Sequence, residues 1–530
     1  MERVYNSPAI RHAKRFSRIL IHESSADDGD TVNHPSMDGS LFCARRFGRA
    51  ALGVAARVAL PCALMALSCG HAFAQGGGAQ SAEAAAAEAP AFAHNPGDTA
   101  WVLAAAALVL FMTPGLAFFY GGLVRSKNML NTIMMSYGAM ALMALLWVVA
   151  GYSIAFGTNP NGPTSPYWGG LGWVGLPEPV KLFTEQFPVV RDAAGTVVAD
   201  PASKAGDPLR LFGTVPHGAF MIFQMMFFII TPALISGSLV ERMKFGAYLA
   251  FIGLWGLLVY CPVAHWVWHP AGWIFARGAM DFAGGAVVHV NAGFAALAGA
   301  LVVGARRGYL KRPMLPHSLP LCLLGVGILW FGWYGFNAGS AGGAGPLGVL
   351  AFVNTTLGAA SAMLAWMLID LVLRKEMTAL GAGTGAVAGL VGITPACGFV
   401  TPIGAIFVGA ITAGVCYVMA TVRAKNRVDD SLDAFAVHGV GGFTGALLTG
   451  IFASGALSGI NPFIVPGGLN TAFIQLYCTA IVAAYSFTVA FVLMTIIKAL
   501  GGVRATEEAE ERGLDVSLHG EEAYSNEVPA

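Results

Sequence analysis

Charged side chains are scarce in this sequence of 530 residues. Asp, Glu, Lys and Arg together make up 11% of the chain, whereas a soluble globular protein has roughly 25%. The formal net charge of +1 leaves no basic excess to hold nucleic-acid phosphates. Hydrophobic residues make up 56%, and the 68 glycines suit close helix–helix contact in lipid. The composition therefore predicts an all-α polytopic membrane protein and excludes a soluble enzyme, a disordered scaffold and a nucleic-acid binder.

Cysteine pairs and catalytic motifs are also missing from the sequence. The eight cysteines include no C-x-x-C pair, so we expect small buried thiols and neither a disulfide framework nor a metal site. The sequence contains no phosphate-binding loop and no recognisable nucleophile–base pair. We therefore expect no enzymatic activity and no cofactor.

The first 74 residues indicate an N-terminal extension followed by a cleavable signal peptide. Arginines precede an apolar run (50–68), and an A-x-A cleavage site follows at 72–74. Translation that really begins near Met37 would explain the polar residues before it. An uncleaved first membrane helix and a lipoprotein signal are the less favoured alternatives. Residues 75–100 are rich in Gly, Ala and Glu and indicate a flexible linker.

The region 101–500 contains eleven apolar stretches long enough to cross a bilayer, which takes about 20 helical residues. We place the spans near 101–123, 131–157, 215–239, 244–266, 284–304, 319–338, 347–372, 378–396, 400–420, 436–455 and 471–499.

Lys and Arg gather in alternate loops between these spans. They follow the first, third, fifth, seventh and ninth spans, whereas the loops after the sixth, eighth and tenth have none. The positive-inside rule then predicts an N-terminus outside and a C-terminus inside, in agreement with a cleaved signal peptide. We therefore expect a multi-pass protein of the cell's inner membrane with a cytoplasmic tail at 501–530.

Two spans resemble each other. Span five contains DFAGGAVVHVNAG and span ten contains DAFAVHGVGG, so each has an acid near its start, Asp281 or Asp433, and a histidine deeper in, His289 or His438. The two spans run in opposite directions through the membrane. This arrangement predicts a five-plus-five inverted repeat with one extra helix.

Ionisable residues inside a membrane span are functional candidates by default. A lone histidine there is often a hydrogen-bonded packing residue, but a pair related by the repeat, His289 with His438, could share one proton and contact a small polar solute. The acids Asp281 and Asp433 are more readily explained as helix N-caps than as substrate ligands. Aromatic rings near span ends, such as Trp268, could hold a dehydrated cation together with a hydroxyl such as Ser340.

The sequence resembles the ammonium transporters of the Amt/Mep/Rh superfamily, and its tail and signal peptide resemble the bacterial branch. The similarity extends from about Trp101 to Tyr524. The motifs that carry it are FYGGLVRSKN (119–128), WVVAGYSIAFG (147–157), ERMKF (241–245), DFAGGAVVHVNA (281–292), GWYGFNAGSAG (332–342), AFVNT (351–355), GITPACGFV (392–400), VDD…DAFAVHGVGG (428–442) and EEAEERGLDVSLHGEEAY (507–524).

This resemblance implies a role for each candidate site residue. Trp268, Ser340 and Phe227 would form an outer ammonium-recruitment site, and Phe227 with Phe336 would form the gate below it. His289 and His438 would be the paired histidines of the pore, and Asp281 would be a supporting acid near the recruitment site.

The resemblance also implies partners. It predicts a homotrimer with one pore per protomer, and a cytoplasmic tail that forms a vestibule with the basic inner loops 305–313 and 421–430. A PII signal-transduction protein would bind this vestibule.

The expected function is ammonium transport for nitrogen utilisation. Because moving the charged ion through a long apolar pore is costly, we expect deprotonation near the Phe gate and passage of neutral ammonia along the two histidines. Two alternatives remain open. A sensor that binds ammonium would be marked by a signalling domain after residue 500, and a neutral-gas channel of the Rh type would lack the recruitment pair Trp268 and Ser340.

Overall fold

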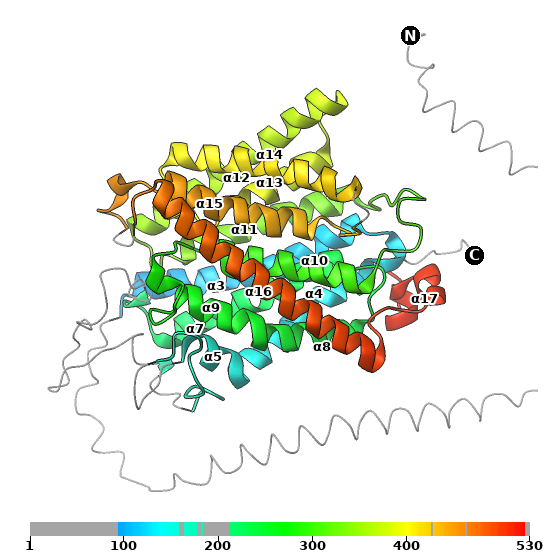
Figure 1. The fold of residues 1–530 in the computed structure, drawn as a ribbon, viewed down its shortest axis with the longest axis horizontal. Coiled ribbons are helices and arrows are strands. Elements are labelled where there is room, and N and C mark those ends of the chain that lie inside the picture. Colours follow the sequence, from blue (N-terminus) through cyan, green and yellow to red (C-terminus); the bar gives the residue numbers. More distant parts are fainter. Residues whose placement is uncertain are drawn as a thin grey trace, which may run out of the picture. The chain divides into compact units, whose positions relative to one another are not determined.

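The computed structural model describes residues 94–157, 164–177, 182–183, 212–425, 428–461 and 464–524, so the predicted N-terminal extension, the signal peptide and residues 75–93 of the predicted linker lie outside the described residues. Helices are the regular elements of the described residues, and they pack side by side in a bundle (Figure 1). The long helical elements are α3 (Pro96–Leu123), α4 (Met129–Leu146), α7 (His217–Ile235), α8 (Phe245–Trp255), α10 (Asn291–Val303), α11 (Leu319–Gly339), α12 (Pro346–Arg374), α13 (Ala379–Ile393), α14 (Pro402–Lys425), α15 (Gly441–Phe452) and α16 (Leu469–Gly501).

Short helical segments extend several of these helices. The π-turns η2 (Trp147–Gly151) and η5 (Gly256–Tyr260) join α4 to α5 (Tyr152–Phe156) and α8 to α9 (Cys261–Trp268). Two further π-turns, η7 (Gly285–Val290) and η8 (Phe435–Val440), lead into α10 and α15. The tail contains α17 (Glu507–Arg512) and η10 (Asp515–His519).

Ten helical stretches of the described residues are long and apolar enough to cross a membrane. The stretch that falls short is the predicted span 378–396, where α13 has only 15 residues. Glycines bring α13 very close to α12, since a Cβ at Gly389 would lie 2.5 Å from the carbonyl oxygen of Gly358. The part of the chain that the structure describes is thus all-helical and has ten stretches long and apolar enough to span a membrane, and a complete eleventh crossing stays a prediction.

The first helix begins earlier than the predicted span. The Asn95 side chain accepts hydrogen bonds from the backbone N–H groups of Gly97 and Asp98, and Pro96 occupies the first helical position. Both features stabilise a helix start, because the first N–H groups have no partner within the helix. The last residues of the predicted linker, 96–100, therefore belong to α3.

The two spans predicted to be related, η7–α10 and η8–α15, contact each other reciprocally. The η7 turn packs against α15, and the η8 turn packs against α10. Glycine permits the close crossing, because a Cβ at Gly293 would lie 2.1 Å from the backbone nitrogen of Gly439. This exchange of contacts is the one that a two-fold relation between the halves would produce.

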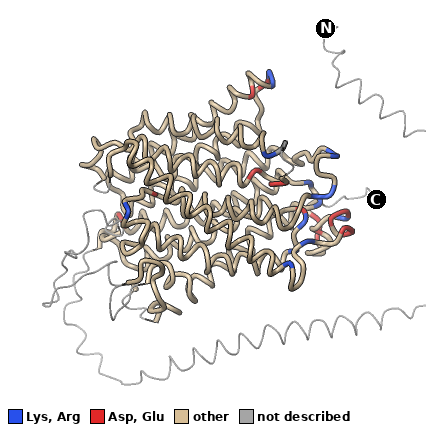
Figure 2. The backbone as a smooth tube through the Cα atoms, viewed as in Figure 1, with Lys and Arg blue, Asp and Glu red and all other residues tan. Residues whose placement is uncertain are grey.

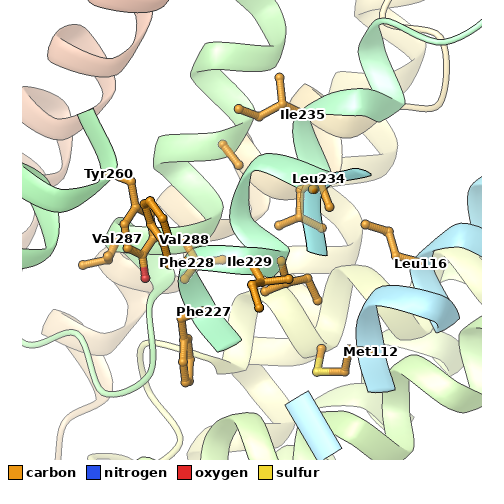
Figure 3. Close-up of a cluster of buried hydrophobic side chains, with 14 of the residues drawn as sticks. Met112, Leu116, Phe227, Phe228, Ile229, Leu234, Ile235, Tyr260, Val287 and Val288 are labelled. Carbon is orange, nitrogen blue, oxygen red and sulfur yellow. The ribbon is translucent and has the colours of Figure 1, made fainter. Parts of the chain in front are cut away.

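The helices differ greatly in how deeply they are enclosed. In the stretch from His217 to Ser238, 89% of the most apolar window is buried, and in Gly285–Val303 the share is 83%, against 28% in Pro346–Arg374. Figure 3 shows side chains from α7 and η7 meeting in one buried cluster, with Phe227 and Phe228 beside Val287 and Val288. The two most deeply enclosed stretches bear the predicted site residues Phe227 and His289.

Lys and Arg residues gather mainly at one end of the bundle, the end at which α17 lies (Figure 2). The loops at this end follow α3, α7, α10, α12 and α14 in the chain. Under the positive-inside rule this end would face the cytoplasm, as the sequence predicts.

Candidate functional site

Three aromatic rings from three helices meet near the end of the bundle opposite α17. The ring centroids of Phe227 (α7) and Phe336 (α11) are 4.5 Å apart, and those of Phe227 and Trp268 (α9) are 5.8 Å apart. Both phenylalanines are 1% exposed, whereas Trp268 is 8% exposed. The structure therefore brings together the two predicted gate rings and places Trp268 against the first of them.

Polar contacts fix the residues beside these rings. The indole N–H of Trp268 donates to the backbone carbonyl of Asp281 at 3.0 Å, which sets the direction of the ring. Ser340 lies at the end of α11, one turn after Phe336, and its hydroxyl donates to the Phe336 carbonyl at 2.8 Å. Since that bond uses the hydroxyl hydrogen, the Ser340 oxygen keeps lone pairs that can accept a hydrogen bond from a cation.

The two predicted pore histidines are in direct contact. The Nδ1 atoms of His289 and His438 are 3.3 Å apart, and the rings stack at 18° with centroids separated by 5.3 Å. The side chains are 1% and 3% exposed. A hydrogen bond between facing Nδ1 atoms requires that one ring donates and the other accepts, so two neutral imidazoles in this contact would adopt different tautomers.

A narrow cavity of about 10 Å³ lies beside the histidines. That volume suits roughly one molecule of the size of water. The His289 Nε2 atom is buried and has no hydrogen-bond partner among the described residues. The cavity is lined by Met112, Leu116, Phe119, Ile230, Leu234, His289, Leu329, Trp333, Phe336, Val387 and His438.

Trp333 is a site residue that the sequence reasoning did not single out. Its ring lies parallel to His289 within 22°, with centroids 5.4 Å apart, and its indole N–H donates to the Thr394 hydroxyl at 2.8 Å. On the same helix, Phe336 also stacks on His289, at 5.8 Å. The three-residue spacing of Trp333 and Phe336 was visible in the GWYGFNAGSAG motif and places both rings on one helix face.

Asp281 has the helix-capping role that was favoured for it. Its carboxylate accepts hydrogen bonds from the backbone N–H groups of four residues, at 2.6–3.1 Å: Gly284, Gly285, Ala286 and Val287. Gly284 adopts a φ of 114°, which favours glycine strongly over other residues. Asp281 thus anchors the turn that leads to His289 and, through its own carbonyl, the ring of Trp268.

The corresponding cap of the other half is Asp430, and the expectation for Asp433 was wrong. The Asp430 carboxylate accepts from the N–H groups of Ala434 at 3.0 Å and Phe435 at 2.9 Å. Asp433 instead pairs with Arg423 at 2.6 Å. The spacing contained the signal, because Asp430 precedes His438 by the same eight residues that separate Asp281 from His289.

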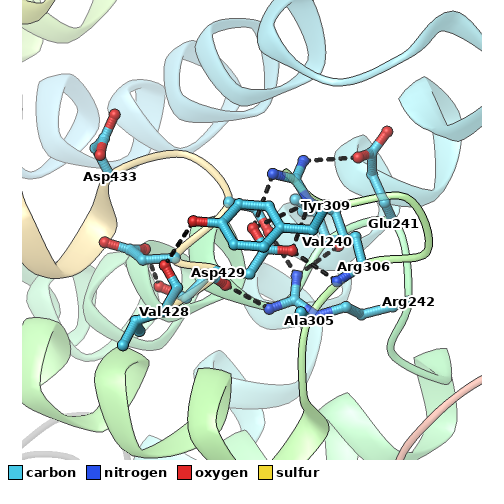
Figure 4. A network of polar contacts seen from close by, with 12 residues as sticks. Val240, Glu241, Arg242, Ala305, Arg306, Tyr309, Val428, Asp429 and Asp433 are labelled. Carbon is cyan, nitrogen blue, oxygen red and sulfur yellow. Dashed lines mark hydrogen bonds and ion pairs between the residues drawn. The ribbon is translucent and has the colours of Figure 1, made fainter. Parts of the chain in front are cut away.

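A buried ionic network lies at the end of the bundle that is rich in Lys and Arg (Figure 4). Arg306 bonds to Glu241 at 2.7 Å and to Asp429 at 2.9 Å. Glu241 also accepts from Arg125 at 2.8 Å. Burial alone would raise the pKa of Glu241, but Arg306 and Arg125 outweigh it and hold that pKa at about 2. Both acids are therefore ionised at neutral pH, since Arg306 and Arg242 likewise lower the pKa of Asp429 against the effect of burial.

The C-terminal tail docks on this network and on the start of α4. The Asp515 carboxylate accepts from the backbone N–H groups of Leu130 and Asn131, at 3.0 and 2.8 Å, and so caps α4 from outside the helix. Farther along, Tyr524 lies 2.9 Å from the ring nitrogen Nε2 of His317. The acids of α17 differ in exposure: Glu507 is 80% exposed, whereas Glu510 is buried and pairs with Arg504.

A line of hydrogen bonds joins the tail to the network. The N–H of Leu514 donates to the Asn128 side chain at 2.9 Å, and that side chain donates to Glu241 at 2.9 Å. Glu241 bonds to Arg306, which bonds to Asp429, the neighbour in sequence of the Asp430 cap. The docked tail is thus connected by direct contacts to the turn that leads to His438.

The described residues contain no group of three or more His, Cys, Asp or Glu side chains arranged to hold a metal ion. The chemistry available at the site is therefore that of aromatic faces, one hydroxyl and two imidazoles around a small apolar cavity.

Known proteins are similar to this chain over most of its length. A sequence model described as Ammonium Transporter Family matches residues 100–524. A protein named ammonium transporter from Mycobacterium tuberculosis (strain ATCC 25618 / H37Rv) is 45% identical over 450 residues, covering 81% of this chain and 90% of that protein. One of the same name from Bacillus subtilis (strain 168) is 42% identical over 434 residues, covering 82% of this chain and 99% of that protein.

Solved structures match as well. The crystal structure of Candida albicans Mep2 superimposes with a TM-score of 0.68 and 33% identity, and the match covers 78% of this chain and 87% of that one. A structure named Sensor Amt Protein superimposes with a TM-score of 0.67 and 27% identity, covering 79% and 98% of the two chains.

Proposed function

Because this chain belongs to the ammonium transporter family, we propose that it recruits ammonium outside, removes a proton at the Phe gate and passes ammonia along the paired histidines. Ammonium transport itself is supported by the family and by the names of the relatives. The steps below are our proposal for how this chain's residues perform it.

Recruitment uses Trp268, Phe227 and Ser340. Ring faces carry negative electrostatic potential and attract a dehydrated cation. The free lone pairs of the Ser340 hydroxyl would accept one N–H of ammonium, because its hydrogen is already donated to the Phe336 carbonyl. The carboxylate of Asp281 already accepts hydrogen bonds from four backbone N–H groups. We therefore give Asp281 a supporting role, in which its backbone carbonyl holds the Trp268 ring.

The observation that carries the proposal is the contact between His289 and His438 beside a cavity that suits one small molecule. A hydrated cation exceeds such a space, and a bare charge in apolar surroundings costs several kcal/mol. Ammonia is neutral, is about as large as water and can accept a hydrogen bond from an imidazole N–H. The unpartnered Nε2 of His289 is the atom best suited to contact it.

The wider assembly follows from the same proposal. We infer a homotrimer in the inner membrane with one pore per protomer, an N-terminus outside after removal of a signal peptide, and a C-terminus inside. The membrane region would be a five-plus-five inverted repeat with one extra helix. The tail 501–530 would be a regulatory segment, since its contacts reach Glu241 and Arg306 through Asn128.

The test is current recording on proteoliposomes exposed to ammonium, methylammonium and potassium. We expect His289→Ala and His438→Ala to abolish ammonium-selective transport while the purified oligomer stays intact, because each loses a pore group. His269→Ala is the matched control, since His269 is also a buried histidine but does not line the cavity. Wild-type rate and selectivity in His289→Ala would refute the deprotonation step.

The same recordings separate the two alternatives. A sensor would bind ammonium without passing a flux that scales with the gradient, and one solved structure of this fold is named Sensor Amt Protein. A neutral-gas channel would give the same uptake in Trp268→Leu as in the wild type, because it has no ion to recruit.

We further propose that a PII signal-transduction protein binds the cytoplasmic face and closes the pores. A three-fold partner on a trimer makes three contacts at once, which strengthens binding without any single tight contact. Co-purification of the detergent-solubilised transporter with its cognate PII protein, under varied ADP, ATP and 2-oxoglutarate, should give one trimer of each. Absence of a complex in all of these conditions would refute PII regulation and leave transport unaffected.

A further inference from the structure

The first turn of α3 holds the segment that contains Ser340. Asp98 accepts a hydrogen bond from the backbone N–H of Ala344 at 2.9 Å, and the indole N–H of Trp101 donates to the carbonyl of Ala338 at 3.2 Å. These two contacts lie on either side of Ser340 in the chain. Since Asp98 and Trp101 are three residues apart, they share one face of α3.

The same carboxylate reaches the segment that leads into α7. The second oxygen of Asp98 accepts from the Thr214 hydroxyl at 2.7 Å, and the backbone N–H of Asn95 donates to the Thr214 carbonyl at 2.8 Å. Thr214 lies three residues before α7, the helix that contains Phe227. Asp98 thus joins the helix exit after Ser340 to the helix entry before Phe227.

We propose that Asp98 is a positioning residue of the recruitment site, which it serves by holding the backbone around Ser340 so that the hydroxyl faces the cation beside Phe227 and Trp268. This inference rests on the proposed recruitment function. Trp101 holds the same segment through Ala338, which precedes Ser340 in the chain, whereas Asp98 holds it through Ala344, which follows Ser340. Without the Asp98 contact, the backbone at Ala344 loses its side-chain anchor, and we expect residues 341–345 to shift together with Ser340 at the end of α11.

The close packing of Asp98 against the loop that contains Gly343 is consistent with a specific contact. A Cβ at Gly343 would lie 2.5 Å from the Asp98 carboxylate, so the glycine allows the carboxylate to sit directly on the loop backbone. Asp98 is also an acid in the first turn of a helix, where it would stabilise α3 through the helix dipole alone. The experiment therefore separates the contact with the loop from a general effect on α3.

The test measures apparent KM and maximal rate for ammonium-evoked current in proteoliposomes of the purified full-length protein. We expect Asp98→Ala to raise KM about threefold to tenfold, the worth of the bond to Ala344 that holds the segment with Ser340, with little change in maximal rate. Asp98→Asn should keep the wild-type KM, because its amide oxygen still accepts from Ala344. Asn95→Ala is the matched control, since it removes a cap of the same helix that does not touch the loop, and it should also keep the wild-type KM.

Double mutants show whether Asp98 acts through Ser340. Ser340→Ala should raise KM by itself, and adding Asp98→Ala should raise it no further, because coupled residues are not additive. Gly343→Ala perturbs the contact from the loop side with α3 unchanged, so it should reproduce the KM effect even where Asp98→Ala assembles poorly.

Each contrary result has a distinct meaning. An unchanged KM in Ser340→Ala would overturn the recruitment site and this inference with it. A raised KM in Ser340→Ala together with wild-type KM in Asp98→Ala and Gly343→Ala would overturn the positioning role alone. An equal rise of KM in Asp98→Asn and Asp98→Ala would show that the charge of Asp98 matters and its contact with Ala344 does not. Effects on KM that multiply in the Ser340→Ala/Asp98→Ala double mutant would show that Asp98 does not act through Ser340. Either result overturns the inference.

Discussion

Replacing Arg306 by Met tests the buried network most directly. The substitution keeps the length of the side chain and its apolar part, but removes the guanidinium that bonds to two buried carboxylates. Glu241 would keep Arg125 at 2.8 Å and Asn128 at 2.9 Å. The carboxylate of Asp429 would lose its ion pair, and Arg306 is the one residue among those described that forms such a pair with it.

The magnitude follows from that loss. Removing one partner of a buried ion pair costs about 3–5 kcal/mol, because the remaining charge stays in surroundings that do not solvate it. Asp429 and Glu241 are 3% and 1% exposed, so water does not replace the missing bonds. Arg306→Lys should cost less than Arg306→Met, since an ammonium group keeps the charge but cannot form the same paired bonds.

The neighbouring residue provides the control. Arg307 is 49% exposed and contacts Glu507 and Glu511 at 3.3 and 3.5 Å, and these acids are 80% and 74% exposed. Arg307→Met should therefore change the free energy of unfolding by at most about 1 kcal/mol. Denaturant unfolding of the detergent-solubilised protein measures both variants. Equal losses in Arg306→Met and Arg307→Met would refute the assignment of stability to the buried network.

Three further predictions concern the gate, the recruitment site and pH. Phe336→Ala should impair ammonium current more than Trp330→Ala, measured in proteoliposomes, because Phe336 lines the cavity; equal defects would contradict a gate. Trp268→Leu should weaken methylammonium capture by roughly 1–2 kcal/mol, the worth of a cation–π contact, and equal binding in both forms would remove Trp268 from recruitment. The Glu241 pKa of about 2 lies below its ordinary value of 4.5, so its stabilising contribution is complete above pH 4.5 and is lost as pH falls towards 2. Unfolding followed from pH 5 to pH 2 should show this loss in the wild type and less of it in Arg306→Met; the same pH dependence in both would contradict the pairing.

Helix positions could be predicted from the sequence because each depends on a local property. Apolar runs of sufficient length identify spans without any knowledge of their neighbours, and ten of the predicted spans meet that requirement in the structure. The start of α3 was missed by five residues, because the cap at Asn95 and Pro96 lies in a segment whose Gly, Ala and Glu content indicates a linker. A cap satisfies the free backbone N–H groups at a helix start. Hydropathy reports only the preference of side chains for an apolar environment, so it does not detect a cap.

Some of the site residues could be identified from the sequence, because they lie in short continuous motifs. The motifs around His289, His438 and Phe336 are local strings, so a resemblance could identify them. Asp430 was missed in favour of Asp433, because either acid could start the helix when this segment is considered alone. The eight-residue distance from Asp430 to His438, the same as from Asp281 to His289, would have distinguished them. At Asp433 φ is 58°, and its side chain turns to Arg423 instead of capping the helix.

The sequence by itself determined that the chain is an all-helical membrane protein, where its spans lie, which end gathers Lys and Arg, and which family it resembles. Only the tertiary structure decided which side chains meet. His289 and His438 are 149 residues apart in the chain, and Asp515 caps α4 by bonding to the N–H of Leu130, 385 residues earlier. Such contacts depend on the path of the whole backbone, since glycines such as Gly293 set how closely two helices cross. Composition and periodicity describe how each helix meets lipid, whereas the cavity, the ring stack and the ionic network arise only where several helices converge.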